Sequence, residues 1–339
     1  PEWLQMDSHG KVVGREPFAP RAISNGEQWR YLCLNTGYLD YICDQVEEVM
    51  DNYDYDGLWF DILMYSNEGC SCPNCTRDMI SAGLSPSSDE DRKSFSFHTL
   101  RKAMERINKL ILSKNPDTLI FFNGRQSITT DTERSFRKDI VFDSHIEIES
   151  LPSGSWGYNH FPTFVRYNQI LGKEIIGMNG KFHKSWGDFG GFKNIAALEF
   201  ESFNMIANGA KICIGDQLHP RGKLNPASYK MIGDIFAEIE QKQPWCENAV
   251  PIANIGLMVA QDEGYSKACR PIIKTLEAAT QMLVEDHRHF QILDFESDLC
   301  QYDLIILPDK VHLDKSMIQK VNEYISRGGK LLMSYESGI

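Results

Sequence analysis

The feature that most constrains the fold is an alternation of helix and strand patterns between about residues 38 and 241. Amphipathic stretches with apolar residues three or four positions apart precede short apolar runs that end in polar residues. This alternation is typical of α/β proteins, in which helices connect parallel strands. The pattern predicts helices at 38–53, 94–114, 196–208 and 227–242, and strands at 57–62, 118–123, 140–149, 174–179 and 210–216.

A closed (β/α)8 TIM barrel contains eight strands, and these five therefore account for part of one. If Asp216 ends the eighth strand, the five are strands four to eight, residues 1–35 are the long loop after the third strand, and the first three strands are missing. An open doubly wound sheet is the alternative, although no glycine-rich phosphate turn follows any of the strands. We expect an α/β protein whose residues 1–242 form a catalytic TIM barrel without its first strands.

A second α/β pattern begins after Pro251. It predicts strands at 252–260, 291–295, 303–307 and 330–334, and helices at 270–286 and 314–326. Gly328-Gly329 would end the last helix. Residues 251–339 are therefore predicted to form a flavodoxin-like domain that is incomplete at its C-terminal end, with 243–251 as the linker.

Charge and cysteine content exclude several classes of partner. The net charge is −12, so a nucleic acid would be repelled. The sequence contains no apolar run long enough to span a membrane. Its nine cysteines are dispersed apart from one cluster, which favours a reducing compartment, and we expect a cytoplasmic protein. The first residue is Pro1, so any targeting segment would lie outside the given sequence.

The segment Gly57-Leu-Trp-Phe-Asp61 is an apolar run that ends abruptly in a carboxylate. Barrel enzymes carry catalytic groups at the carboxyl ends of their strands. Retaining glycosidases need two carboxyl groups, one as nucleophile and one as proton donor. Asp61 is our candidate nucleophile, and the alternative is that it caps the following helix.

The second carboxyl group is predicted on the strand that contains His145-Ile-Glu147-Ile-Glu149. The period of two puts His145, Glu147 and Glu149 on one face. Glu149 is nearest the end of the strand, just before a loop rich in aromatic residues, and is our candidate acid/base. Glu147, Glu201 and Asp188 are the alternatives.

Several motifs resemble those of α-L-fucosidases. Tyr-Asp-Gly-Leu-Trp-Phe-Asp61 resembles their nucleophile strand, and Phe122-Asn123-Gly-Arg125 followed by Ser155-Trp156-Gly-Tyr158-Asn159 is similar to the segments that close their fucose pocket. The resemblance implies that Asp61 is the nucleophile and that Arg125 and Trp156 contact the sugar. The other predicted substrate-binding residues are Trp59, Asn123, Glu147, Tyr158, His183, Trp186 and His219. His219 and Asp216 would either line the pocket or fix their loop.

The order of the domains resembles β-galactosidases that carry a trimerisation domain. That family uses two glutamates, one at the fourth strand and one at the seventh. Here the fourth strand ends in Asp61, and the seventh, Ile175-Ile-Gly-Met-Asn179-Gly, has no acid. A fucosidase-like site with a galactosidase-like layout resembles the family-151 α-L-fucosidases and their hypothetical glycosyl-hydrolase relatives. These resemblances imply a homo-oligomer, either a trimer or a dimer.

Cys70, Cys72 and Cys75 form a Cys-x-Cys-x-x-Cys motif, and Cys33 would supply a fourth ligand for tetrahedral zinc. Four thiolates leave no open position, so zinc here would be structural and no cofactor is expected for catalysis. Reduced free thiols and a redox role are the alternatives. Cys269 would fit an amidotransferase-type nucleophile, but no nucleophile elbow surrounds it.

Together these patterns predict a retaining exo-glycosidase, specifically an α-L-fucosidase, that acts on an oligosaccharide or glycoside. One alternative is a β-galactosidase-like or α-L-arabinosidase-like hydrolase of the same architecture. The other is a non-catalytic carbohydrate-binding or scaffold protein, because unpaired strand edges would expose a barrel that lacks three strands.

Overall fold

The computed structural model describes residues 2–15, 29–66, 68–154, 156–184, 186–188, 190–261 and 273–338. Cys269 and the predicted helix start at Arg270 lie outside these residues. The chain divides into two compact units, one built mainly from residues 1–126 and 132–144 and the other from 127–131, 145–266 and 270–339. The domain boundary predicted at 242–251 falls within the second unit and stays a prediction.

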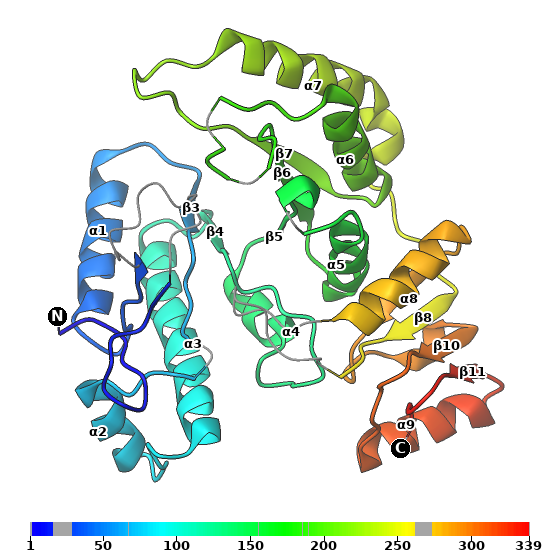
Figure 1. The fold of residues 1–339 in the computed structure, drawn as a ribbon, viewed down its shortest axis with the longest axis horizontal. Helices are drawn as coiled ribbons and strands as arrows, with labels where there is room; N and C mark the ends of the chain where they lie inside the picture. The colour runs from blue at the N-terminus through cyan, green and yellow to red at the C-terminus, as the bar shows by residue number, and fades with distance from the viewer. Residues whose placement is uncertain are drawn as a thin grey trace. The chain divides into compact units, whose positions relative to one another are not determined.

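The first unit is built around a parallel strand pair, β3 and β4 (Figure 1). Its register runs from Gly57 opposite Leu119 to Phe60 opposite Phe122. The elements of this unit are β1 (Gly14–Arg15), β2 (Trp29–Arg30), α1 (Tyr38–Asn52), β3 (Gly57–Phe60), α2 (Pro73–Ser81), α3 (Asp89–Lys114), β4 (Leu119–Phe122), α4 (Phe136–Asp139) and the 3-10 turn η1 (Ile140–Phe142).

Helix α3 supplies much of the core of this unit. Its buried residues Leu100, Met104, Ile107 and Ile111 recur three or four positions apart, as expected for one helix face. The Ser88 side chain accepts from the Asp91 N–H and caps the helix, which therefore begins five residues earlier than the predicted start at 94. In the described part of the chain, neither α3 nor any other helix is long and apolar enough to cross a membrane.

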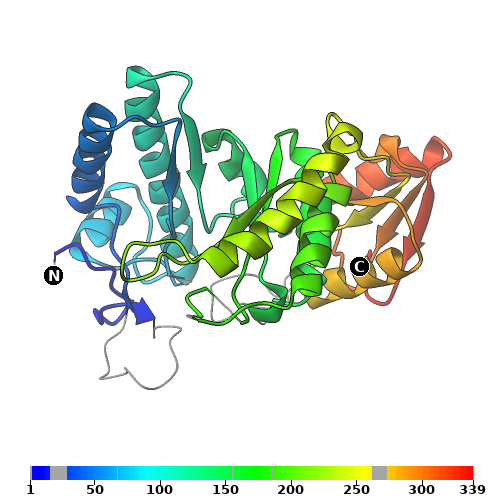
Figure 2. The same cartoon turned by 90° about the horizontal axis from the view of Figure 1, so that it is seen from above.

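The second unit contains two parallel sheets (Figures 1 and 2). The first has the order β5-β6-β7, and the second has the order β11-β10-β8-β9. The elements are β5 (Ile146–Glu149), η2 (Pro152–Gly154), α5 (His160–Asn168), η3 (Gln169–Leu171), β6 (Ile175–Gly180), α6 (Ile195–Ala207), β7 (Lys211–Gly215), α7 (Pro226–Cys246), β8 (Ile255–Met258), α8 (Lys274–Glu285), β9 (Phe290–Leu293), η4 (Leu299–Gln301), β10 (Leu304–Leu307), α9 (Lys315–Ser326) and β11 (Lys330–Met333).

The two faces of the β5-β6-β7 sheet differ. On one face Ile146 and Ile148 are fully buried, and a Cβ at Gly177 would lie 2.5 Å from Met205 of α6, so this face packs against helices. Strand alternation puts Glu147 and Glu149 on the opposite face, where both are half-buried. The helices thus cover one face and leave the acids on the other.

The C-terminal sheet has helices on both sides. Figure 1 shows α8 on one side of this sheet and α9 on the other. Met317, Val321 and Tyr324 of α9 pack into a core with residues of β8, β9 and β10. Across this unit, the Tyr167 hydroxyl of α5 donates a 3.0 Å hydrogen bond to Asp294, just after β9.

Predicted boundaries also differ from the structure at one strand and at the linker. The predicted strand 140–149 begins only at Ile146, because residues 136–142 are helical: the Ser135 side chain caps α4, and the buried Asp139 binds two arginines. The predicted linker 243–251 starts too early, because α7 continues through Pro244 to Cys246.

Candidate active site

Asp61 follows β3 directly, at the carboxyl end of the strand. Phe60 lies opposite Phe122 in the parallel register, so Asp61 and Asn123 are neighbours at the two strand ends. Asn123 Nδ2 donates a 2.9 Å hydrogen bond to Asp61 Oδ1. An exposed carboxylate is thereby held where barrel enzymes carry their catalytic groups.

The backbone turns sharply after this pair. Ile62 has a φ of 49°, in the left-handed region that β-branched residues rarely adopt. Gly124 has a φ of 85°, and a Cβ there would lie 3.7 Å from Ile62 Cα. The conformation of Ile62 is strained, and such a conformation persists only when the surrounding structure imposes it. Asp61 therefore sits next to a strained residue, a feature that recurs at functional sites.

Trp59 lies two residues before Asp61, on the same face of β3. Its side chain is 43% exposed, whereas Leu58 and Phe60 pack against the core. The Trp59 ring centroid lies 6.3 Å from that of Phe121 on β4. An exposed indole beside a carboxylate is suited to stacking on a sugar ring.

Arg125, a predicted sugar contact, is buried. Its guanidinium donates from Nε and Nη2 to Asp139 Oδ2, and Arg101 Nε donates to Asp139 Oδ1 at 2.7 Å. It also lies 5.6 Å from the centroid of the Phe97 ring. These contacts stabilise the segment after β4, and the sugar contact of Arg125 stays a prediction. Asp139 and Arg101 are 38 residues apart, and no local pattern singles them out.

Glu149 is the last residue of β5, on the face away from the helices. Trp186, from the loop after β6, donates from Nε1 to Glu149 Oε1 at 2.5 Å. This contact links the ends of two neighbouring strands. Trp186 was predicted as a substrate contact, and its bond to the candidate acid/base was not predicted.

Glu147, the alternative acid, lies one pleat further from the strand end. Its Oε1 is 2.8 Å from His145 Nε2, and both side chains are largely buried. Burial raises the pKa of Cys213 on β7, and the charge of Glu147 raises it further. Glu147 therefore belongs to a more interior group than Glu149, which ends the strand, and the role of Glu149 as acid/base stays a prediction.

Sequence reasoning missed an ion pair after β6 and β7. Lys181 Nζ lies 3.3 Å from Asp216 Oδ1, and the two side chains are 7% and 9% exposed. The ammonium group also lies 5.5 Å from the centroid of Phe182 and 5.0 Å from that of Phe192. The available signal was a charged residue immediately after each of two adjacent strands.

The aromatic residues after β5 contact the helices. The Trp156 ring lies 4.8 Å from that of His160 in α5, and the Tyr158 ring lies 5.7 Å from that of Phe200 in α6. Tyr158 lines a small pocket together with Glu201, and its pKa is raised by burial and then by the charge of Glu201. The roles of Trp156 and Tyr158 as sugar contacts stay predictions.

The remaining alternative acids have structural partners. Glu201 is buried, and its Oε2 accepts from Lys193 Nζ at 2.6 Å and from Asn179 Nδ2 at 3.2 Å. Burial raises the pKa of Glu201, and Lys193 opposes that shift. Asp188 accepts from the Lys184 N–H at 3.1 Å and caps its own loop.

The two predicted histidine contacts are exposed. His219 Nδ1 accepts from the Arg221 N–H at 3.4 Å, so His219 shapes its own turn. His183 lies in the loop after β6, where a Cβ at Gly191 would approach its Cβ to 3.1 Å. The substrate contacts predicted for both histidines stay predictions.

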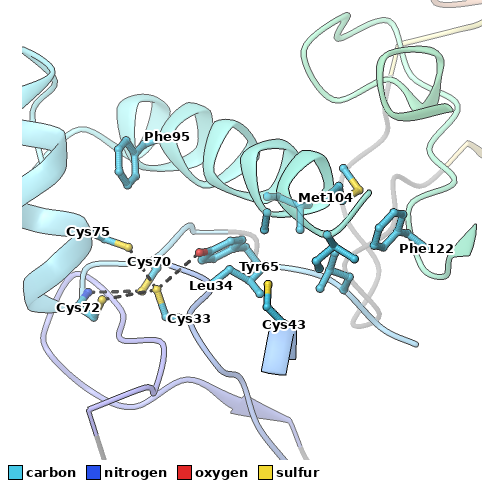
Figure 3. Packing of buried hydrophobic residues seen from close by; sticks show 14 of the residues in the cluster. Cys33, Leu34, Cys43, Tyr65, Cys70, Cys72, Cys75, Phe95, Met104 and Phe122 are labelled. Atoms are coloured by element: carbon cyan, nitrogen blue, oxygen red, sulfur yellow. Dashed lines mark hydrogen bonds between the residues drawn. The ribbon is translucent and has the colours of Figure 1, made fainter. Parts of the chain in front are cut away.

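Four cysteines of the first unit meet in one buried cluster (Figure 3). The sulfur atoms of Cys33, Cys70, Cys72 and Cys75 all lie within 4.8 Å of one another. The sulfur of Cys33 is 3.4 Å from that of Cys75 and 3.7 Å from that of Cys72. Zn–S bonds of about 2.3 Å in a tetrahedron separate the sulfur atoms by about 3.8 Å, so the four side chains fit a zinc ion.

The surroundings of the cluster also fit a structural metal. The Cys72 N–H donates to Cys70 Sγ at 3.5 Å, and the Tyr65 hydroxyl lies 3.6 Å from Cys33 Sγ. Such contacts orient ligands in metal sites. A zinc ion here would join the loop that contains Cys33 to the loop and helix after β3, and the four thiolates would leave no position for a substrate.

Comparisons with known proteins agree with the sequence resemblances. Alpha-L-fucosidase isoenzyme 2 from Paenibacillus thiaminolyticus is 37% identical with a TM-score of 0.88, and the match covers 100% of this chain and 50% of that one. The β-galactosidase from Bacillus circulans sp. alkalophilus is 14% identical with a TM-score of 0.70, covering 100% of this chain and 59% of that one. The β-galactosidase from Rahnella sp. R3 is 12% identical with a TM-score of 0.70, and the match covers 100% of this chain and 58% of that one.

Residues 280–339 match the family described as Beta-galactosidase trimerisation domain. The comparison with curated proteins found no match. The chain spans half the length of the fucosidase, and its likeness to the β-galactosidases concerns the fold alone. The predicted resemblance is confirmed: over its whole length the chain is related to an α-L-fucosidase, within the fold of TIM-barrel glycoside hydrolases, and its C-terminal part matches the β-galactosidase trimerisation domain.

Proposed function

We propose that the protein is a retaining exo-α-L-fucosidase with Asp61 as nucleophile and Glu149 as acid/base. The observation that carries the proposal is the hydrogen bond from Asn123 to Asp61 at the ends of two parallel strands. It gives a carboxylate a fixed position at the strand ends where barrel enzymes act. The 37% identity to an α-L-fucosidase supports the choice of sugar.

The reaction has two steps. In the first, an Asp61 oxygen bonds to the anomeric carbon, the glycosidic C–O bond breaks, and Glu149 gives its proton to the leaving oxygen. In the second, Glu149 takes a proton from water, the water oxygen bonds to the anomeric carbon, and the bond to Asp61 breaks. The two inversions give net retention.

A β-galactosidase of the same architecture is the second candidate, supported by the fold likeness. The residues at the ends of two strands do not fit the catalytic pair of a β-galactosidase. β6, the predicted seventh strand of the barrel, has the sequence Ile-Ile-Gly-Met-Asn-Gly and carries no acid, and the predicted fourth strand ends before an aspartate. Those are the two positions at which the β-galactosidases carry glutamates.

We further propose that the domains are a barrel part at 1–242 and a flavodoxin-like domain at 251–339. In chain order the C-terminal strands are arranged 2-1-3-4, the order of a flavodoxin-like sheet. The match to a trimerisation domain supports a homo-oligomer, and the four thiols support a structural zinc ion.

The test is Asp61→Asn in the whole protein, assayed with an aryl α-L-fucoside. We expect turnover to fall by several orders of magnitude, as when a nucleophile is removed. Asp56→Asn, at the opposite end of β3, is the matched control and should stay active. Turnover like that of the wild type in Asp61→Asn would eliminate Asp61.

A second variant separates a nucleophile from a structural acid. Asp61→Gly opens space for azide, which should restore turnover and give a fucosyl azide of inverted configuration. Without such rescue, Asp61 would have an electrostatic or structural role. An aryl β-galactoside as the parallel substrate decides between the two candidate activities.

A further inference from the structure

We propose that Trp186 is a positioning residue for Glu149, and that Gly180 and Gly215 form the floor that admits its indole. The inference rests on the proposed function, in which Glu149 is the acid/base. It goes beyond a sugar contact, because it assigns to Trp186 an effect on proton transfer.

In the hydrogen bond between Trp186 and Glu149, the indole is the donor and the carboxylate is the acceptor. Trp186 Nε1 lies 2.5 Å from Glu149 Oε1, and an indole N–H can only donate. A hydrogen bond to a carboxylate is among the stronger kinds, and its geometry fixes the orientation of the acceptor. The indole thus fixes the direction in which Glu149 presents its carboxyl group.

The indole rests on two glycines that pair across β6 and β7. Gly180 lies opposite Gly215 in the register of the two strands. A Cβ at Gly215 would lie 2.2 Å from Cζ3 and 2.4 Å from Cη2 of Trp186, and a Cβ at Gly180 would lie 3.3 Å from Cζ3. Real Cβ atoms do not approach other atoms to 2.2 Å, so a side chain at 215 and the indole exclude each other.

Backbone conformation does not explain these glycines. Several glycines of this chain have positive φ values, but Gly180 and Gly215 are not among them. Any residue could adopt their backbone geometry. What requires glycine at 215 is the space that the indole occupies.

A third residue fixes the tilt of the indole. The Phe182 ring meets the Trp186 ring edge to face, with centroids 5.2 Å apart and an interplanar angle of 70°. With its six-membered ring over the glycines, the Phe182 ring beside it and its N–H on Glu149, the indole is held in one orientation. A side chain can orient another group only if its own orientation is fixed, and the Trp186 indole meets this requirement.

The decisive variant is Trp186→Phe, which keeps an aromatic ring and removes the N–H. A substrate with a poor leaving group needs the proton from Glu149, whereas an activated aryl fucoside departs without it. We expect kcat/KM to fall roughly ten- to a hundredfold for the poor leaving group and to change little for the activated one. An equal loss on both substrates through a higher KM would make Trp186 a sugar contact and overturn the proposal, as would no loss.

Gly215→Ala is the independent variant, because its methyl group takes the place of the indole. It should reproduce the leaving-group dependence of Trp186→Phe, and in a Trp186→Ala background it should add nothing. Gly177→Ala is the matched control: it adds a methyl group to the same sheet, but against Met205 and Phe161 on the helix side. It should lower stability without changing the leaving-group dependence. Additive effects of Gly215→Ala and Trp186→Ala would overturn the proposal.

A measurement without substrate separates this inference from the proposed reaction. The chain has six tryptophans, whose indole N–H groups each give one signal in a proton–nitrogen NMR spectrum. The signal lost in Trp186→Phe should shift in Glu149→Gln and Gly215→Ala and stay in place in Gly177→Ala. If it stays in place in Glu149→Gln, the contact does not exist and the inference fails. If it shifts but Glu149→Ala itself shows no leaving-group dependence, the contact stands, and both the reaction assigned to Glu149 and the positioning role are wrong.

Discussion

The two candidate catalytic carboxylates are supported in different ways. Asp61 accepts from Asn123, which follows the adjacent strand in register, so both partners are fixed by the sheet. Glu149 accepts from Trp186, which reaches it from a loop. The nucleophile must meet one carbon atom, and strand ends give it a fixed position. The acid/base must hold and release a proton. Its partner, Trp186, lies in a loop, and Gly180 and Gly215 leave the space that its indole occupies.

A further contrast is with the buried acids. Asp139 binds two arginines, and Glu201 binds Lys193. Removing one partner of a buried ion pair leaves an uncompensated charge, which is strongly destabilising. These two acids, held by cations, therefore serve stability, whereas Asp61 accepts from the amide of Asn123 and Glu149 accepts from the indole of Trp186.

The largest effect on this comparison should come from Glu149→Ala. We expect turnover of natural oligosaccharides to fall by roughly two orders of magnitude or more, and that of an activated aryl fucoside to fall far less, because only the former needs the proton. A small added nucleophile should raise turnover of the activated substrate.

Glu147→Ala is the control, because Glu147 lies on the same strand face, bound to His145. If Glu147→Ala shows the leaving-group dependence instead, the roles of the two glutamates are exchanged. If neither variant shows it, the acid lies elsewhere, with Glu201 and Asp188 next to test.

Removal of the thiol cluster should affect stability rather than chemistry. Elemental analysis of protein purified without chelator should find one zinc ion per chain, and Cys72→Ser should abolish it. Because structural zinc contributes folding free energy, Tm should fall by on the order of 10 °C. Cys300→Ser, at an exposed cysteine, is the control. Substoichiometric metal with unchanged Tm would leave reduced free thiols as the interpretation.

Asn123→Ala tests the other half of the comparison. Loss of the amide that holds Asp61 should lower turnover roughly tenfold on good and poor leaving groups alike, because the nucleophile acts on both. This uniform loss is the opposite of the selective loss expected for Trp186→Phe. A loss confined to poor leaving groups would mean that Asn123 acts on the acid rather than on Asp61.

The smallest effect is a pH dependence at Glu201. Burial raises the pKa of Glu201 above its ordinary value of 4.5, so folding favours the neutral form. The contribution of Glu201 to stability is therefore fully present below about pH 4.5 and is lost as the pH rises through the raised value. The unfolding free energy of the wild type relative to Glu201→Gln should decrease over that window in urea titrations.

Glu105 gives the control of opposite sign. Its hydrogen bond with Lys109 lowers its pKa, so its contribution is present above about pH 4.5 and is lost as the pH falls. The unfolding free energy of the wild type relative to Glu105→Gln should therefore increase with pH over this window. The change should be small, because the Glu105–Lys109 pair is exposed. A slope of the same sign for both variants would mean that Lys193 outweighs burial at Glu201.

Some of these contacts follow from the sequence and some do not. The sequence predicts Asp61 and Asn123 near the ends of two successive strands, and parallel strands end at the same edge of a sheet. The register that makes the two residues neighbours, and the hydrogen bond between them, were not predicted. The helix of residues 136–139 does not follow from the sequence, since it depends on Asp139 meeting arginines that are distant in sequence. The bond from Trp186 to Glu149 depends on the path of a loop and on two glycines whose role is visible only beside the indole.

The strained Ile62 has a consequence for attempts to engineer this protein. Its side chain is 46% exposed, so replacing it sacrifices little packing. Glycine and asparagine adopt the left-handed conformation more readily than isoleucine, and selection for heat resistance would favour them at this position. Each variant selected in this way would relax the turn that adjoins Asp61. Thermal selection alone would therefore enrich proteins that last longer and turn over more slowly.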